Sequence, residues 1–163
     1  MPNEPIERAV RQLHDSGLAS ASDVVGCTAA EIAHVEAQAS VQLPRLYKEF
    51  LSRMGRSTGA FLKGSDFTYP AVTTLRSDAD RLPEDSRAGW KLKAADFVFL
   101  GHQGYEFLFF DCAQGDDPPV QLLTEGENPR EVFPRFSEWL ARCVADEIAA
   151  FRDAERPRTD GGR

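Results

Sequence analysis

The stretch ASVQLPRLYKEFLSRMG, from Ala39 to Gly55, constrains the fold more than any other part of the chain. Its large apolar side chains recur at intervals of three and four residues, the spacing of one wide face of an α-helix. Pro44 stands where the first helical turn tolerates a missing N–H, and Gly55 stands where a helix can leave through a left-handed residue. The pattern predicts a helix between these two residues with a buried apolar face.

Three other helices are predicted from spacing and end signals. Apolar residues recur at helical intervals over Ile6–Leu13, and Gly17 is expected to end that helix. Thr28 and Glu31 have the spacing of a capping box, in which each side chain bonds the other's backbone, so a second helix begins there. A long apolar stripe over Phe136–Phe151 predicts a closing helix.

The middle of the chain favours strands. Two aromatic runs in DFVFLGHQGYEFLFFDC flank the turn at residues 101–104, which is the pattern of a β-hairpin, and PPVQLLT predicts a third strand. A short helix over residues 75–82 is expected before Pro83. The order of elements predicts an α+β fold: a small antiparallel sheet flanked by N-terminal helices and a long C-terminal helix.

The predicted core draws on both halves of the chain. Large apolar residues are expected there because they lie on the buried faces of the predicted helices and strands. These nine residues are Leu43, Tyr47, Phe50, Leu51, Phe107, Phe109, Phe136, Trp139 and Leu140.

The length and composition fit one soluble domain. We expect a single domain over residues 1–155 of the 163, followed by a disordered polar tail at 156–163. The net charge of −7 argues against a nucleic-acid partner, which requires a basic face. No signal peptide, membrane-spanning run or paired cysteine spacing is evident, so a cytoplasmic location is expected. The oligomeric state does not follow from the sequence.

Few residues suggest chemistry. None of the three histidines has a His or Cys partner at i+3 or i+4, and no cluster completes a zinc site, so neither a metal nor another cofactor is predicted. Cys112 follows Asp111 at a predicted strand end, and His102 lies across the same hairpin, which leaves a hydrolase as one alternative. The other interpretation is that Cys112 packs as a small hydrophobe. We expect a protein that is not an enzyme.

An excess of acidic residues is the strongest surface feature. Residues 106–131 hold seven acidic residues and one base, and a second acidic run follows residue 77. Such loops beside a sheet suit a basic protein partner, although a merely solvated acidic surface gives the same pattern. Asp116 and Asp117 also suit a solvated turn. The candidate partner-binding residues are Asp78, Asp80, Glu84, Asp85, Asp111, Asp116, Asp117, Glu125 and Glu127.

Two blocks resemble the SUKH superfamily, in its cell-wall-assembly-regulator (SMI/KNR-type) branch. The first is EIAHVEAQASVQLPRLYKEFLSRMG, where the matching residues are Ile32, Glu36, Leu43, Pro44, Tyr47, Phe50, Leu51 and Gly55. The second is YEFLFFDCAQGDDPPVQLLTEGENPREVFPRFSEWLARCV, where they are Phe107, Phe109, Asp117, Pro118, Pro119, Val120, Phe136, Trp139 and Leu140. The resemblance covers residues 28–145 best and is weak over 56–95.

The resemblance implies a binding module without catalytic residues. In bacteria such domains are typically immunity proteins, which bind and neutralise a cognate toxin domain of a polymorphic or contact-dependent system, often a nuclease. The expected partner is therefore a cognate toxin domain. The alternative is an intracellular adaptor or regulatory protein-binding module without a toxin partner, since a fold alone does not decide function.

Overall fold

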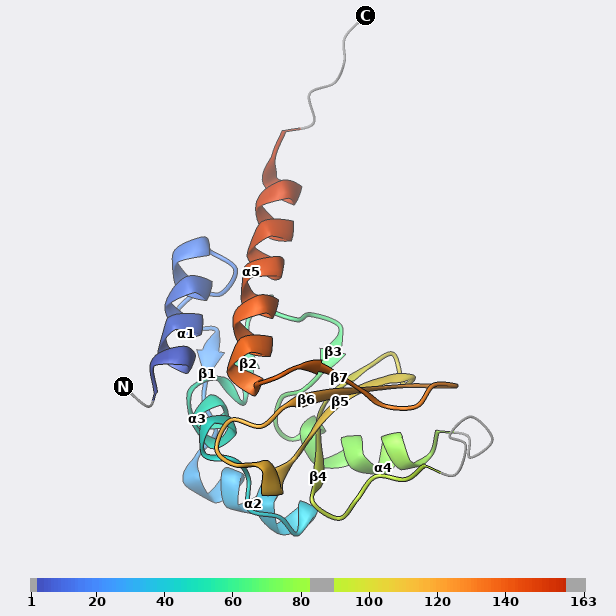
Figure 1. Ribbon diagram of the computed structural model, residues 1–163. Coiled ribbons are helices and arrows are strands. Elements are labelled where there is room, and N and C mark those ends of the chain that lie inside the picture. The colour runs from blue at the N-terminus through green and yellow to red at the C-terminus, as the bar shows by residue number, and fades with distance from the viewer. Residues whose placement is uncertain (1–2, 83–89, 158–163) are drawn as a thin grey trace, which may run out of the picture.

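The computed structural model describes residues 3–82 and 90–157, and it confirms the α+β fold (Figure 1). The helices in this part of the chain are α1 (Glu4–Ser16), α2 (Ala29–Ala39), α3 (Arg45–Met54), α4 (Leu75–Asp80) and α5 (Phe136–Glu155). Short 3₁₀ turns are η1 (Ala71–Thr74) and η3 (Cys112–Gln114). The strands are β1 (Val24–Val25), β2 (Ser57–Thr58), β3 (Ser65–Asp66), β4 (Asp96–His102), β5 (Glu106–Asp111), β6 (Val120–Thr124) and β7 (Arg130–Phe133).

The main sheet is antiparallel in the order β3-β4-β5-β6-β7, and β1 pairs with β2 separately. The hairpin of β4 and β5 and the strand β6 were predicted, whereas β3 and β7 were not. Both missed strands are short, and their place in the sheet comes from pairing with β4 and β6 rather than from an apolar pattern. Pro129 and Pro134 bracket β7, which limits the length of this edge strand.

Most of the aromatic core lies on the face of the sheet that α3 and α5 cover, and Phe107 and Phe109 are buried on the other face. The ring of Tyr47 from α3 packs against Phe97, Phe110 and Phe136, with ring centroids 5.2–5.5 Å apart. Trp139 of α5 lies edge-on to Phe99 at 4.9 Å. All nine residues expected in the core are buried in the structure. The apolar stripe of the opening segment thus joins α3 to the sheet and to α5.

The opposite face of the sheet is covered less completely. Leu75 of α4 reaches Gly101 of β4, and α4 lies beneath the sheet in Figure 1, while α5 rises from its other side. Helix α1 runs alongside α5 at the far end of the molecule. Among the helices of residues 3–82 and 90–157, none is long and apolar enough to cross a membrane. A groove lies on this face over Phe109 of β5 and Gln121 of β6.

The expected helix ends are partly correct. Thr28 and Glu31 form the predicted capping box, and Gly17 ends α1 in the left-handed conformation. Gly55, however, has φ −74°, so the prediction of a left-handed exit from α3 is wrong. A Cβ at Gly55 would lie 2.7 Å from Cys27 Sγ and 2.5 Å from a carbonyl oxygen of α3, so close packing requires the glycine. Pro44 precedes the first helical residue rather than occupying it.

We expect the ion pair between Glu31 and Arg56 to stabilise the fold only above acidic pH. The Arg56 guanidinium, with the Thr28 backbone N–H, lowers the pKa of Glu31 from 4.5 to about 2. Because the folded pKa is depressed, this contribution is present above the unfolded pKa and is lost as the pH falls toward 2. Arg56→Gln should lower the urea midpoint near neutral pH and have a much smaller effect near pH 2, where about half of the Glu31 carboxyl groups are protonated. An equal loss at both pH values would contradict this.

The hydroxyl of Tyr47 offers a second stability test. This side chain is fully buried, and its oxygen has no hydrogen-bond partner in the described part of the chain. A buried hydroxyl without a partner costs free energy, so Tyr47→Phe should raise the free energy of unfolding by about 1 kcal/mol. Chemical denaturation measures the change. A lower stability for Tyr47→Phe would show that the hydroxyl is bonded in solution.

Candidate functional site

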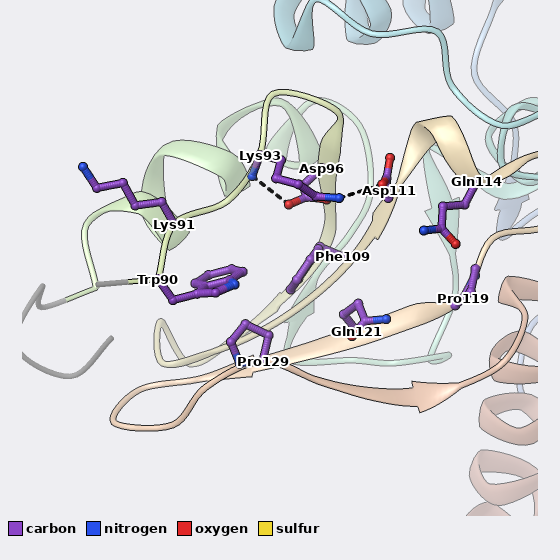
Figure 2. A pocket seen from close by; sticks show the side chains of 10 residues that line it. All are labelled: Trp90, Lys91, Lys93, Asp96, Phe109, Asp111, Gln114, Pro119, Gln121 and Pro129. Carbon is purple, nitrogen blue, oxygen red and sulfur yellow. Dashed lines mark hydrogen bonds and ion pairs between the residues drawn. The ribbon is translucent and has the colours of Figure 1, made fainter. Parts of the chain in front are cut away.

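A groove lies over the less completely covered face of the sheet, beside Trp90 (Figure 2). Its floor is formed by Phe109 of β5 and Gln121 of β6, which are paired across the two strands. Trp90 forms one wall, with its ring 5.9 Å from that of Phe109. The groove encloses about 250 Å³, and its lining residues are Trp90, Lys91, Lys93, Asp96, Phe109, Asp111, Gln114, Pro119, Gln121 and Pro129.

Arg76 of α4 holds the segment that forms the wall. Its guanidinium donates to the backbone carbonyls of Leu92, Lys93 and Asp96 at 2.9–3.3 Å. Its Nε also donates to Asp80 Oδ2 at 3.0 Å, which orients the guanidinium. An arginine suits this role because its planar fork offers five donors in fixed directions. The wall is therefore anchored to α4 by charge-assisted hydrogen bonds.

One end of the groove is charged. Asp111 accepts from Lys93 Nζ at 2.8 Å and from the backbone N–H of Ala113 at 2.8 Å. The Lys93 ammonium lowers the pKa of Asp111. Asp96 is 4% exposed and accepts from the Lys93 backbone N–H at 2.7 Å, and burial raises its pKa. Two carboxylates and one flexible cation thus meet beside an aromatic surface (Figure 2).

The predicted acidic residues do not form one surface. Asp111 lies in the groove, whereas Asp116 is exposed and pairs with Arg45 of α3 at 3.4 Å. Asp117 accepts from both the backbone N–H and the hydroxyl of Ser137, at 2.9 and 2.6 Å, in the first turn of α5. Its position fixes the start of that helix, so the expectation of a solvated turn does not hold for Asp117.

The remaining candidate acidic residues that the structure describes lie on two other elements. Glu125 and Glu127 lie in the exposed turn between β6 and β7, which leads to Pro129 at the groove. Asp78 and Asp80 are on α4, where they pair with Arg81 and Arg76. Glu84 and Asp85 lie outside the described residues.

Sequence reasoning missed the residues that shape the groove. Trp90 and Lys93 fall in the stretch that gave no clear pattern, and Gln121 stood in a predicted strand without a role. Phe109 was expected only as a core residue. A tryptophan between two polar stretches was the one available signal, since a half-buried tryptophan often marks a contact surface.

The possible hydrolase residues are not brought together. The register places His102 opposite Glu106 and Asp111 opposite Asp96, at opposite ends of the hairpin. The Nδ1 of His102 lies 3.0 Å from Ser65 Oγ. Burial raises the pKa of Cys112 to about 12, which keeps the thiol protonated and weakly nucleophilic. In residues 3–82 and 90–157, no group of three or more His, Cys, Asp or Glu side chains is placed to hold a metal ion.

A second hollow lies beneath α5 and differs in character. It encloses about 190 Å³ and is lined largely by apolar side chains, among them Leu108, Leu122 and Trp139. It lacks the paired carboxylates and the exposed lysine of the groove. The groove therefore offers the richer set of contacts to a polar partner.

Most of the chain is similar to one known protein family. The model of the SMI1 / KNR4 family (SUKH-1) matches residues 26–142, which is more than half of the chain. The match includes α2, α3, the whole main sheet and the start of α5, and it leaves out α1. A search of curated proteins finds no match.

Proposed function

The chain belongs to the SMI1/KNR4 (SUKH-1) family, and from this premise we propose that it is a bacterial immunity protein. In this proposal it binds a cognate toxin domain in a stoichiometric complex and neutralises it inside the producing cell. The toxin is one of a polymorphic or contact-dependent system, with a nuclease as one candidate. The protein acts by occupying a surface of the toxin and has no catalytic step of its own.

We propose that the groove is the surface that binds the toxin, because its lining combines apolar and polar side chains. Aromatic side chains beside charged and amide groups are typical of protein-interaction surfaces, which combine an apolar centre with polar margins. Trp90, Phe109 and Pro129 supply the apolar part, and Asp111 and Gln121 supply polar groups. The acidic turn with Glu125 and Glu127 continues this surface, and the net charge of −7 favours approach of a basic toxin.

Co-expression tests the proposal. The C-terminal domain of the protein encoded immediately upstream is expressed with and without this chain, and cell survival is scored. We expect the domain to kill cells that lack the chain and to spare cells that contain it. A toxin domain from an unrelated system is the specificity control, and the chain should give no protection against it.

The same experiment addresses the alternative of an adaptor without a toxin partner. An adaptor need not be encoded beside a toxin and would not rescue growth. Toxicity without rescue, in cells that contain the folded chain, would contradict the immunity proposal. It would favour the adaptor.

A further inference from the structure

We propose that the groove receives an arginine side chain from the protein partner, with its stem against Trp90 and Phe109 and its guanidinium on Asp111. The inference rests on the proposed function, because it names the chemistry of the contact that a bound toxin makes. In the free protein, the Lys93 ammonium occupies the place beside Asp111 that the arginine guanidinium takes in the complex.

The apolar part of the groove suits the stem of an arginine. Phe109 lies between Trp90 and Asp111 in Figure 2, and because it is only 4% exposed, the half-buried Trp90 supplies most of the aromatic surface that an extended side chain meets on its way to the carboxylate. Long cationic side chains bury their methylene groups along apolar surface and keep the charged head in a polar place. The face of a tryptophan also attracts a guanidinium within about 6 Å.

The charged end already holds a cation supplied by the chain itself. Lys93 Nζ lies 2.8 Å from Asp111 Oδ2, and its side chain is 66% exposed, whereas that of Asp111 is 17% exposed. A solvent-exposed ion pair contributes little to stability, so displacing Lys93 from Asp111 costs little. The half-buried carboxylate stays in place because Ala113 N–H also bonds it.

An arginine fits Asp111 better than the lysine it displaces. A carboxylate offers about four acceptor positions, and Lys93, Ala113 and the Gln114 side chain engage Asp111 in the free protein, so a guanidinium takes the place that Lys93 leaves. A guanidinium can bond both oxygens through two parallel N–H groups, which a lysine ammonium does not match. Asp96 beside it adds negative charge at the same end of the groove, which disfavours an anionic ligand.

The test uses a capped arginine, N-acetyl-arginine amide, as a probe in amide NMR titrations of the full chain. N-acetyl-norleucine amide is the uncharged control with a similar stem. We expect the arginine probe to shift the Trp90 indole and the amides of Phe109 and Gln121, and to bind more tightly than the control. Asp111→Asn should weaken this binding about tenfold, since it removes the charge but keeps an acceptor for Ala113 N–H.

Alanine variants of Lys93 and Lys91 test whether Lys93 competes with the arginine for Asp111. Lys93→Ala should tighten arginine binding severalfold, because the competing cation is gone. Lys91→Ala removes the same charge from the same wall and is the matched control, so general electrostatics alone predicts equal effects for the two. Equal effects, or arginine shifts no larger than those of norleucine, would overturn the proposal.

The two proposals fail separately. Protection against the toxin without arginine binding in the groove would leave the immunity function standing and reject the arginine contact. Arginine binding with the expected Lys93→Ala and Asp111→Asn effects, but no protection, would reject the immunity function alone.

Discussion

Replacing Gly26 by alanine is expected to lower the free energy of unfolding by at least about 3 kcal/mol, enough to lower the thermal midpoint by roughly 10 °C. A Cβ at this position would lie 1.8 Å from the carbonyl oxygen of Ser52 in α3. The obstacle is helix backbone, which cannot turn aside as a flexible side chain can. Thermal and chemical denaturation measure the loss.

The surrounding hydrogen bonds prevent the chain from relieving this clash. Cys27 N–H donates to the Leu51 carbonyl at 2.8 Å, and Arg56 N–H donates to the Val25 carbonyl at 2.9 Å. Both bonds join the β1 segment to the end of α3, so moving Gly26 away would break them. Their loss would expose the edge of the core at Cys27.

Gly64→Ala is the matched control for Gly26→Ala. Gly64 has φ +93°, and nothing lies within 4 Å of a Cβ placed there. Its substitution should therefore cost only the strain of the left-handed backbone, about 1–2 kcal/mol. Equal losses for the two variants would show that steric contact with α3 is not the reason for Gly26.

Trp90→Ala is expected to weaken the complex with the toxin domain by about 30-fold or more, equivalent to roughly 2 kcal/mol. Trp90 forms a wall of the groove and packs against Phe109, so its loss removes both the contact surface and the shape of the groove. Tryptophan in such a position is the residue type most often responsible for a large share of binding energy. Calorimetric titration of the purified partner measures the affinity.

Tyr105→Ala controls for the loss of an aromatic side chain on the same sheet. Tyr105 is 38% exposed and lies in the turn between β4 and β5, outside the groove. Its substitution should change the affinity by less than about twofold, while the circular dichroism spectra of both variants remain like that of the parent. Comparable weakening by the two variants would place the binding surface elsewhere.

Local signals explain why much of the fold could be predicted. The capping box joins Thr28 to Glu31, three residues apart, and the buried stripe of α3 lies within ten residues. Apolar periodicity likewise predicted α5, and two aromatic runs around a turn predicted the hairpin of β4 and β5. Gly55 shows the limit of this reasoning. Its place after the helix suggested a left-handed helix end, whereas a glycine is needed there because a Cβ would lie too close to Cys27.

The candidate site depends on contacts between distant residues and was therefore harder to predict. Asp117 bonds Ser137, twenty residues away, and the run of acidic residues around Asp117 gave no sign of this contact. The groove needs Phe109 opposite Gln121, which follows from strand register, and a wall held by Arg76. No short sequence pattern contains these relationships.

We propose that this SMI1/KNR4 family member neutralises a toxin by stoichiometric binding, and a titration of toxin activity with the chain distinguishes this mechanism from the alternatives. A fixed amount of the purified upstream toxin domain is mixed with increasing amounts of the chain, and the remaining activity is measured. The account predicts a linear fall that reaches zero at a fixed ratio of chain to toxin and does not change with incubation time. Continued inactivation by much smaller amounts of the chain, or full activity at an excess of it, would contradict the account.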